Sequence, residues 1–332
     1  MLGVLIGLAV CYGLANGVHD AGNAIAAPIV TRAMRAPAAI GLSFVFHVAG
    51  ALLVGRAVAA TIGGVIDLHE PDVVAVMVSA LVGALAWNLV TLRLGLPCSS
   101  GHTLVGALAG AAWANAGAGA VHWGGLEGIR PVGVVGVLIW LSFATIVAVP
   151  AAFVVSRATR RVLHRARRNL AVTVRHGEVV TTAALSFAHG SNDGQKTMGL
   201  IGLSLVVTGH LSSFAVPFWA AVVAALALAI GTSFGGWRVV ATLGSRIFRL
   251  SPLDGLTSSA TSSSIVFVGS VVGAPLSTTD VVAPSIVGVG AGQRFHHVGW
   301  GVVAEIGLSW LVTLPVSALA GAAGILVWRW SR

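Results

Sequence analysis

The sequence has few charged residues. Only 9% of its 332 residues are Asp, Glu, Lys or Arg, whereas about 25% of an ordinary soluble domain is charged. It also has only two cysteines, Cys11 and Cys98, both inside apolar stretches. The first shortage excludes a water-soluble globule, and the second excludes a disulfide framework and a thiolate metal cluster. We expect both thiols to be buried in the protein core.

Hydrophobic residues make up 56% of the chain, glycine occurs 43 times and the mean hydropathy is +0.93. Several charge-free runs are long enough to cross roughly 30 Å of hydrocarbon, which indicates a polytopic helical membrane protein. A net charge of +9 would suggest nucleic-acid binding in a soluble protein. Here the bases lie between apolar runs, where they fix membrane orientation, so the expected partner is the lipid bilayer and not nucleic acid.

The apolar runs form two groups of five, one on each side of a basic stretch. The first group is 1–18, 37–55, 73–92, 94–121 and 132–155, and the second is 179–205, 211–234, 255–279, 281–293 and 306–328. This pattern predicts an all-α fold with about ten transmembrane segments. Runs that hold proline, glycine and paired hydroxyls are expected to form re-entrant hairpins, which enter the membrane and return to the same side.

A basic connector, residues 157–177, separates a first repeat at residues 1–156 from a second at residues 178–332. Its segment RATRRVLHRARRN, residues 157–169, is the one strong charge run of the chain. The excess of arginine in cytoplasmic loops of membrane proteins places this connector in the cytoplasm. Five changes of side precede it, so the N-terminus is expected outside.

Two unlike motifs recur in the same order in the two halves, as in transporters built from two related repeats. NGVHDAGNAIA at 16–26 matches HGSNDGQKTMG at 189–199, which aligns Asp20 with Asp193. GLPCSSGHTLVGALAGA at 95–111 matches GAPLSTTDVVAPSIVGVGA at 273–291, which aligns Ser99 with Ser277. An odd number of crossings separates the copies, so the repeats should be inverted relative to each other.

Asp20 and Asp193 are candidate functional residues because an ionised carboxylate at the bilayer centre costs at least roughly 2.5 kcal/mol without a partner. Each follows a glycine by three residues. We expect the helix to break there and to expose the N-terminal amides of the next half-helix, which bind anions. Asn23 and Lys196 lie three residues after the aspartates, on the same helix face.

The second motif places consecutive hydroxyls after a proline, and proline favours the first turn of a helix. We therefore expect these hydroxyls at two helix N-termini that face each other, an arrangement that suits a tetrahedral oxyanion. The hydroxyl residues are Ser99 and Ser100 in the first copy and Ser277, Thr278 and Thr279 in the second.

Three further residues could titrate. His102 and Asp280 occupy equivalent positions in the two copies, and His19 adjoins Asp20. For His102 and Asp280, holding the hairpin in register is the alternative role.

At these motifs the chain resembles the inorganic phosphate transporter (PiT) family, and its bacterial low-affinity phosphate permeases especially. The family motif G-x-N-D-x-x-N or G-x-N-D-x-Q-K corresponds to GVHDAGN and GSNDGQK, and the hairpin motifs correspond to LPCSSGH and APLSTTD. The chain departs from the family pattern at Gly22, Gly101 and Asp280. The last departure adds a negative charge near an anion site.

The resemblance implies a secondary transporter of the bacterial plasma membrane that imports inorganic phosphate by cation symport, with no enzymatic activity, cofactor or resident metal. The coupling cation is H⁺ or Na⁺, and His19 together with the pair Gln195 and Lys196 favours H⁺. A divalent metal accompanying the phosphate and a homodimer are further predictions. The expected substrate ligands are Asn23, Ser99, Ser100, Asn192, Gln195, Lys196, Ser277, Thr278 and Thr279, and the expected cation or proton sites are His19, Asp20, His102, Asp193 and Asp280.

Two alternatives stay open. Sulfate is also a tetrahedral oxyanion, and a cage of hydroxyls and amides suits both anions, so a sulfate permease of the same fold is the nearer alternative. An intramembrane serine hydrolase that uses Ser99 or Ser100 with His102 or another buried histidine is the more distant one. Such an enzyme would have no need of duplicated aspartate motifs.

Overall fold

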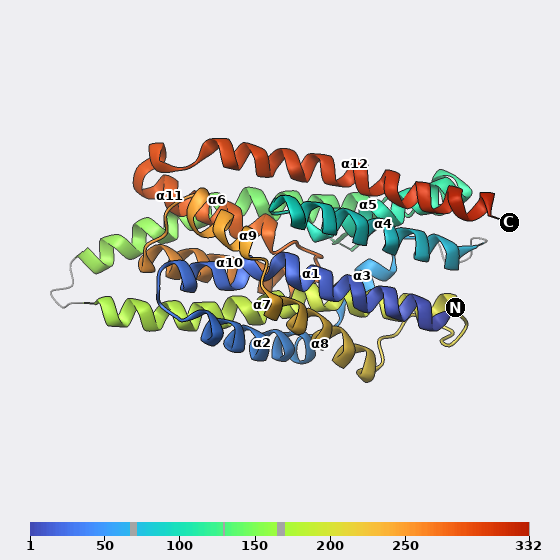
Figure 1. Ribbon diagram of the computed structural model, residues 1–332, viewed down its shortest axis with the longest axis horizontal. Helices are drawn as coiled ribbons and strands as arrows, with labels where there is room; N and C mark the ends of the chain where they lie inside the picture. Colours follow the sequence, from blue (N-terminus) through green and yellow to red (C-terminus); the bar gives the residue numbers. More distant parts are fainter. Residues whose placement is uncertain (67–71, 129, 165–169, 332) are drawn as a thin grey trace.

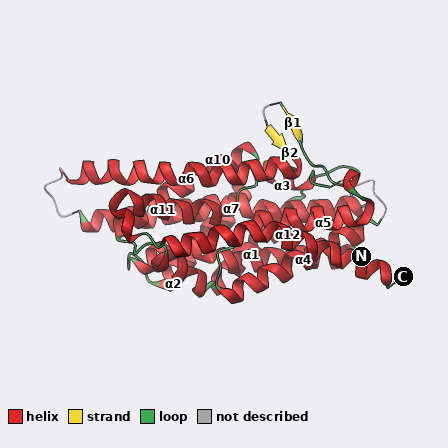
Figure 2. Ribbon diagram, turned by 90° about the horizontal axis from the view of Figure 1, so that it is seen from above, coloured by secondary structure: helices red, strands yellow, loops and turns green. Residues whose placement is uncertain are grey.

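A computed structural model describes residues 1–66, 72–128, 130–164 and 170–331. Twelve α-helices lie in these ranges, most of them parallel or antiparallel to the long axis of the molecule (Figure 1). A short antiparallel hairpin of two strands projects from one side of the helical bundle (Figure 2). The prediction of an all-α fold is confirmed.

Six of these helices precede the basic connector. They are α1 (Leu2–Val30), α2 (Ala36–Leu53), α3 (Ala57–Gly63), α4 (Val73–Leu94), α5 (Ser100–Ala116) and α6 (Gly133–His164), with a 3-10 turn η1 (Ala118–Ala120) and strands β1 (Gly125–Glu127) and β2 (Arg130–Val132) between α5 and α6. Each of the five apolar runs predicted in this half overlaps one of the long helices.

The other six follow the connector in the same order of long and short elements. They are α7 (Ala171–Val207), α8 (Phe218–Phe234), α9 (Trp237–Ala241), α10 (Pro252–Val272), α11 (Thr279–Arg294) and α12 (Trp300–Trp330), with a π-helical turn η2 (Thr242–Arg246) after α9 and a 3-10 turn η3 (Phe295–His297) after α11. Within the connector, residues 157–164 continue α6 and residues 171–177 begin α7, while residues 165–169 lie outside the described part of the chain.

The two sets of helices run in opposite directions. Helix α1 starts at the end of the molecule that holds both termini and runs toward the end where α6 stops, whereas α7 runs the other way (Figure 1). Helices α6 and α12 are related in the same manner. This antiparallel arrangement is that of two inverted repeats.

The repeats exchange helices with each other. Helix α12 packs along α5 of the first repeat, and α6 packs along α11 of the second. Likewise α8 packs against α1, and α2 packs against α7. Each of these four contacts therefore has a counterpart in which the two repeats change places.

Glycine allows these exchanged helices to approach closely. A Cβ atom on Gly17 of α1 would lie 2.3 Å from the carbonyl oxygen of Leu228 in α8, and one on Gly190 of α7 would lie 2.1 Å from that of His47 in α2. The predicted breaks at these glycines are wrong, because α1 and α7 both continue through them as unbroken helices. Gly17 and Gly190 serve helix packing, as small residues commonly do in membranes.

Helices α4 and α5 form a first hairpin with its tip at residues 95–99, and α10 and α11 form a second hairpin with its tip at residues 273–278. The first hairpin occupies the half of the molecule nearer the termini and the second the half nearer the connector (Figure 1). Their tips meet in the middle, where they contact α1 and α7. The prediction of re-entrant hairpins agrees with this arrangement.

Six helices of the described residues are long and apolar enough to cross a membrane. A seventh candidate is the pair formed by α8 and the segment Trp237–Arg246, bent by 66° at the break between them. Helix α7 is longer than any of these but carries buried polar and charged side chains at its centre. Two apolar clusters lie toward the two ends of the bundle, and the polar centre of α1 and α7 lies between them.

The expectation for the cysteines is correct for one of them. Cys98 is buried at the tip of the first hairpin, but Cys11 lies exposed on α1. A helix in a membrane presents apolar side chains to lipid as well as to the protein core, so an apolar run does not show which face a residue occupies.

Candidate functional site

Asp193 lies at the centre of the site, buried where the two hairpin tips contact α7. Its Oδ1 atom accepts hydrogen bonds from the ammonium of Lys196 and, at 3.3 Å, from the hydroxyl of Ser100. Its Oδ2 atom accepts a hydrogen bond from the hydroxyl of Thr278. One carboxylate therefore binds the tips of both hairpins, because Ser100 belongs to the first and Thr278 to the second.

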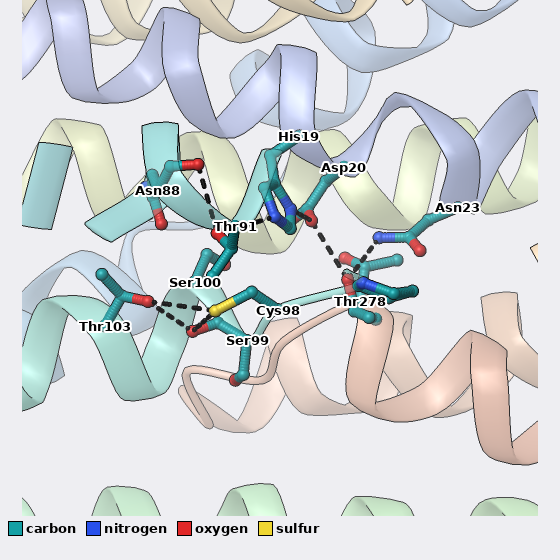
Figure 3. A network of polar contacts seen from close by, with 12 residues as sticks. His19, Asp20, Asn23, Asn88, Thr91, Cys98, Ser99, Ser100, Thr103 and Thr278 are labelled. Atoms are coloured by element: carbon teal, nitrogen blue, oxygen red, sulfur yellow. Dashed lines mark hydrogen bonds and ion pairs between the residues drawn. The ribbon is translucent and has the colours of Figure 1, made fainter. Parts of the chain in front are cut away.

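Asp20 is the counterpart of Asp193 in the first repeat, and it is equally buried. Its Oδ1 atom accepts a hydrogen bond of 3.0 Å from Thr279 and lies 3.2 Å from Nδ1 of His19 (Figure 3). The other ring nitrogen of His19 lies 3.3 Å from the hydroxyl of Thr91 in α4. Asp20 therefore connects α1 to the second hairpin, while His19 connects α1 to the first.

Two of the hydroxyl bonds cross between the repeats. Ser100 of the first repeat donates to Asp193 of the second, and Thr279 of the second donates to Asp20 of the first. The predicted hydroxyl and acidic residues therefore come together in one place, built by both repeats. Ser99 and Thr278 are the residues before α5 and α11, so two helix N-termini point into the same region.

Helix N-termini carry backbone N–H groups without a partner inside the helix and a partial positive charge. Two of them converging beside hydroxyl groups form an anion site without any net charge from side chains. The predicted N-terminal position of the hydroxyls is confirmed. The prolines do not start the helices themselves, since Pro97 and Pro275 lie in the tips before them.

Asp280 connects the hairpins a second time. Its Oδ2 atom accepts a hydrogen bond of 2.7 Å from Ser99 and lies 3.5 Å from Nδ1 of His102. Its backbone oxygen accepts a hydrogen bond of 2.9 Å from Thr145 of α6. Asp280 and His102, aligned by the sequence repeat, are thus close together in space, at the contact between the two hairpins.

Several buried oxygens of the site have no hydrogen-bond partner among the described residues. They are Oδ2 of Asp20, Oδ1 of Asn23, Oδ1 of Asn192, Oγ of Ser277 and Oδ1 of Asp280. A buried polar atom without a partner is costly, so native proteins rarely retain one without a reason. Each of these atoms lies on a residue that the sequence assigns to substrate or cation binding, and each is available to a ligand.

Two of the predicted substrate ligands are engaged with the protein itself. The Oε1 atom of Gln195 accepts from the backbone N–H of Val58 at 2.9 Å and its Nε2 atom donates to the backbone oxygen of Ser191 at 2.5 Å. Gln195 thereby caps the N-terminus of α3. Asn192 donates to the backbone oxygen of Ala274 at 3.0 Å and so holds the second hairpin tip on α7.

His189 is a residue of this cluster that the sequence motifs did not predict. This buried residue lies 3.3 Å from Oδ2 of Asp193 through Nε2, and its Nδ1 atom lies 2.8 Å from Nε2 of His47 in α2. One ligand atom each of Asp20, His189 and Asp193 lie within 4.8 Å of one another, a spacing suitable for a bound cation. The spacing of His189 and Asp193, four residues apart on α7, is the sequence signal that could have found it.

Tyr12 is the second residue that the sequence analysis missed. It is the only tyrosine of the chain, is fully buried and donates a hydrogen bond of 3.1 Å to the backbone oxygen of Ser100. This bond ties the N-terminus of α5 to α1, about two helix turns before Asp20. Tyr12 thus positions the hydroxyl that contacts Asp193.

The geometry does not support a serine hydrolase. Ser100 donates to Asp193 and Ser99 donates to Asp280, and in the described part of the chain neither hydroxyl is hydrogen-bonded to a histidine ring. A nucleophilic serine needs a base within hydrogen-bond reach, and a histidine does not fill that role here.

Comparison with known proteins agrees with this arrangement. The sequence model of the phosphate transporter family matches residues 16–176 and 165–321. A probable low-affinity inorganic phosphate transporter of Rhizobium meliloti (strain 1021) is 37% identical over 96% of this chain and 93% of its own length, and one of Bacillus subtilis (strain 168) is 35% identical over 96% and 94%. A solved structure described as the sodium-dependent phosphate transporter is 21% identical, covers 99% of this chain and 98% of its own, and superimposes with a TM-score of 0.85, which shows the same fold.

The relatives are named as transporters and not as enzymes, in keeping with the hydrogen bonds of the two serines. On the family match and on these identities, the chain belongs to the phosphate transporter family and is a multi-pass membrane protein.

Proposed function

We propose that this protein imports inorganic phosphate together with a cation, and that the cation is H⁺ in preference to Na⁺. The observation that supports this most strongly is the crossed pattern of hydroxyl bonds, in which each hairpin tip donates to the aspartate of the other repeat. Phosphate would take these hydroxyls and the amides of α5 and α11 as its donors. The carboxylates would then be free to hold the cation or proton.

The charge of the loaded site favours symport. Phosphate, Asp20 and Asp193 are all negative, and only Lys196 among these residues brings a positive charge. Moving such a site through a low-dielectric layer requires added positive charge, because unpaired buried charges are strongly unfavourable. Bound H⁺ or Na⁺ supplies it. Rocking of one repeat against the other would then expose the site to each side in turn.

Phosphate suits the site better than sulfate because of its proton. Oδ2 of Asp20 and Oδ1 of Asp280 are buried and have no partner in the described part of the chain. The hydroxyl of HPO₄²⁻ can donate to such a carboxylate, whereas SO₄²⁻ has no donor and is only repelled. The sulfate permease therefore stays the second candidate function and is less favoured.

Uptake of labelled phosphate into proteoliposomes tests this proposal. We expect uptake under an imposed pH gradient, acid outside, that exceeds uptake under an imposed Na⁺ gradient, and little inhibition by an excess of sulfate. Protein-free liposomes are the control, and repeating the assay with a chelator shows whether a divalent metal accompanies phosphate. Uptake driven by Na⁺ alone would contradict the choice of H⁺, and displacement of phosphate by sulfate would contradict the choice of anion.

We further propose that the basic connector lies in the cytoplasm of a bacterial cell and that both termini lie outside, since the connector and the termini are at opposite ends of the molecule (Figure 1). In a variant with Cys11 and Cys98 replaced by serine, a membrane-impermeant thiol reagent should label Ser331→Cys in intact cells but not Ala158→Cys. The opposite labelling pattern would reverse the orientation. The homodimer stays a prediction that the mass of the detergent-solubilised protein would test.

A further inference from the structure

Lys196 is a fully buried lysine in the middle of α7. Its ammonium donates to Oδ1 of Asp193 and, at 3.1 Å, to the hydroxyl of Ser100. Ser100 in turn donates to the same carboxylate oxygen at 3.3 Å. A carboxylate, a hydroxyl of the opposite repeat and the side chain three residues further along the helix thus form a closed group of three.

The first repeat contains a related group of three, in which the third side chain is hydrogen-bonded to the hydroxyl but, among the described residues, not to the aspartate. Its hydroxyl belongs to Thr279, one position after Thr278, which the sequence repeat aligns with Ser100. Asn23 follows Asp20 by three residues, as Lys196 follows Asp193. Its Nδ2 atom donates to the hydroxyl of Thr279 at 2.9 Å, and Thr279 donates to Oδ1 of Asp20 at 3.0 Å. The inverted repeat therefore places an amide in one group where it places an ammonium in the other.

The two groups differ in how many of their acceptor oxygens lack a hydrogen-bond partner. In the second repeat, both oxygens of Asp193 accept hydrogen bonds, and one of them takes the positive charge of Lys196. In the first repeat, Oδ2 of Asp20 and Oδ1 of Asn23 are buried without a partner in the residues that the structure describes. Both free atoms are acceptors, so the group at Asp20 can bind a cation or a proton. The group at Asp193 already has a positive charge, which the side chain of Lys196 supplies.

We propose that the ammonium of Lys196 is a resident cation that replaces one transported cation, so that the coupling cation binds at Asp20 and no second transported cation binds beside Asp193. This inference rests on the proposed symport of phosphate. A resident charge travels with the protein in both the loaded and the empty half of the cycle, so it contributes nothing to the net charge moved. It nevertheless compensates one negative charge of the loaded site, and each phosphate therefore requires one fewer external cation.

The sharpest test is Lys196→Asn, which gives the second group the same residue types as the first. We expect the variant to require one additional cation for each phosphate. The ratio of charge moved to labelled phosphate taken up by proteoliposomes should rise by one elementary charge, under whichever of the imposed Na⁺ or pH gradients drives the wild type. Lys196→Arg keeps the charge and is the matched control, for which the ratio should equal that of the wild type.

The reciprocal change, Asn23→Lys, places a second resident ammonium beside Asp20. Its ratio of charge to phosphate should fall by one, and its uptake should lose most of its dependence on the driving cation. A third readout needs no transport. The midpoint of thermal unfolding is measured for the purified proteins as Na⁺ replaces choline, or as the proton concentration rises. This midpoint should rise more steeply for Lys196→Asn than for the wild type, because binding at a second site adds its own stabilisation.

Unchanged ratios in both variants, or an unchanged shift in thermal unfolding if the variants do not transport, would overturn the inference. A raised KM for phosphate with an unchanged ratio in Lys196→Asn would also overturn it, because Lys196 would then be a direct ligand of the anion. If the wild type itself takes up no phosphate, the proposed function fails instead. The two failures are therefore distinguishable.

Discussion

Replacing Asp20 with asparagine should reduce cation-driven phosphate uptake by roughly tenfold to a hundredfold, because a hydrogen bond or contact that involves a buried charge contributes about 1.5–3 kcal/mol. Asparagine has nearly the same shape and can still accept the hydrogen bond from Thr279 through its amide oxygen. It has no charge with which to hold a cation or proton. The initial rate of labelled phosphate uptake in proteoliposomes measures the effect.

Asp20 gives a cleaner result than Asp193, because neutralising Asp193 would also leave the buried ammonium of Lys196 without its carboxylate and so weaken folding. The matched control is Glu305→Gln, a carboxylate-to-amide change at an exposed residue whose nearest charge is Arg246 at 3.7 Å. Its uptake should equal that of the wild type. Uptake by Asp20→Asn at the control rate would remove Asp20 from the coupling site.

Replacing Gly50 with alanine should strongly destabilise the bundle. A Cβ atom at Gly50 of α2 would lie 2.0 Å from the backbone oxygen of Phe187 in α7, which no flexible side chain can relieve. Forcing atoms into a packed interface typically costs about 1–3 kcal/mol. We expect a lower midpoint of thermal unfolding for the purified protein and less protein in the membrane.

Gly41 of the same helix provides the control, since a Cβ atom there meets nothing within 4 Å. Gly41→Ala should leave stability unchanged or raise it by up to about 1 kcal/mol, because glycine disfavours the interior of a helix. Equal unfolding midpoints for the two variants would show that α2 and α7 do not approach as closely as described.

The sequence predicts the number and order of long helices well because charge-free runs of sufficient length are a strong physical signal in a membrane. It predicts poorly which face of each helix meets the lipid and which face packs in the protein. Cys11 is exposed and Cys98 is buried although both lie in apolar runs, because lipid and protein core accept the same side chains. Helix α7 shows the converse, because Asp193 and Lys196 of the site interrupt its apolar run 179–205 and the whole helix is not among those apolar enough to cross a membrane by hydropathy alone.

The two glycines before the aspartates show that tertiary contacts determine whether a helix breaks or continues where the local sequence allows both. A glycine three residues before a buried aspartate is compatible with a broken helix and equally with a close helix crossing. Gly17 and Gly190 belong to the second case, because backbone oxygens of α8 and α2 occupy the space of their missing side chains. Those oxygens come from residues far away in the sequence, so nothing near the motif itself reveals them.

The residues of the site that occur in both repeats could be predicted from the sequence. Two aspartates and two hydroxyl clusters that recur in one order indicated a shared pocket, and the structure brings them together. The repeat does not indicate which hairpin tip is hydrogen-bonded to which aspartate. It also does not identify site residues that have no equivalent in the other repeat. His47 and His189, 142 residues apart in the chain, form their contact only after α2 has packed on α7.

Because α6 and α12 each pack on the hairpin of the other repeat, one repeat alone cannot form the pocket. A chain with one repeat would have no partner helix for its hairpin and no opposing aspartate for its serine or threonine hydroxyls. It could complete the same pocket only by meeting a second copy of itself inserted upside down in the bilayer. The arginine-rich connector keeps the two opposite orientations together in one molecule.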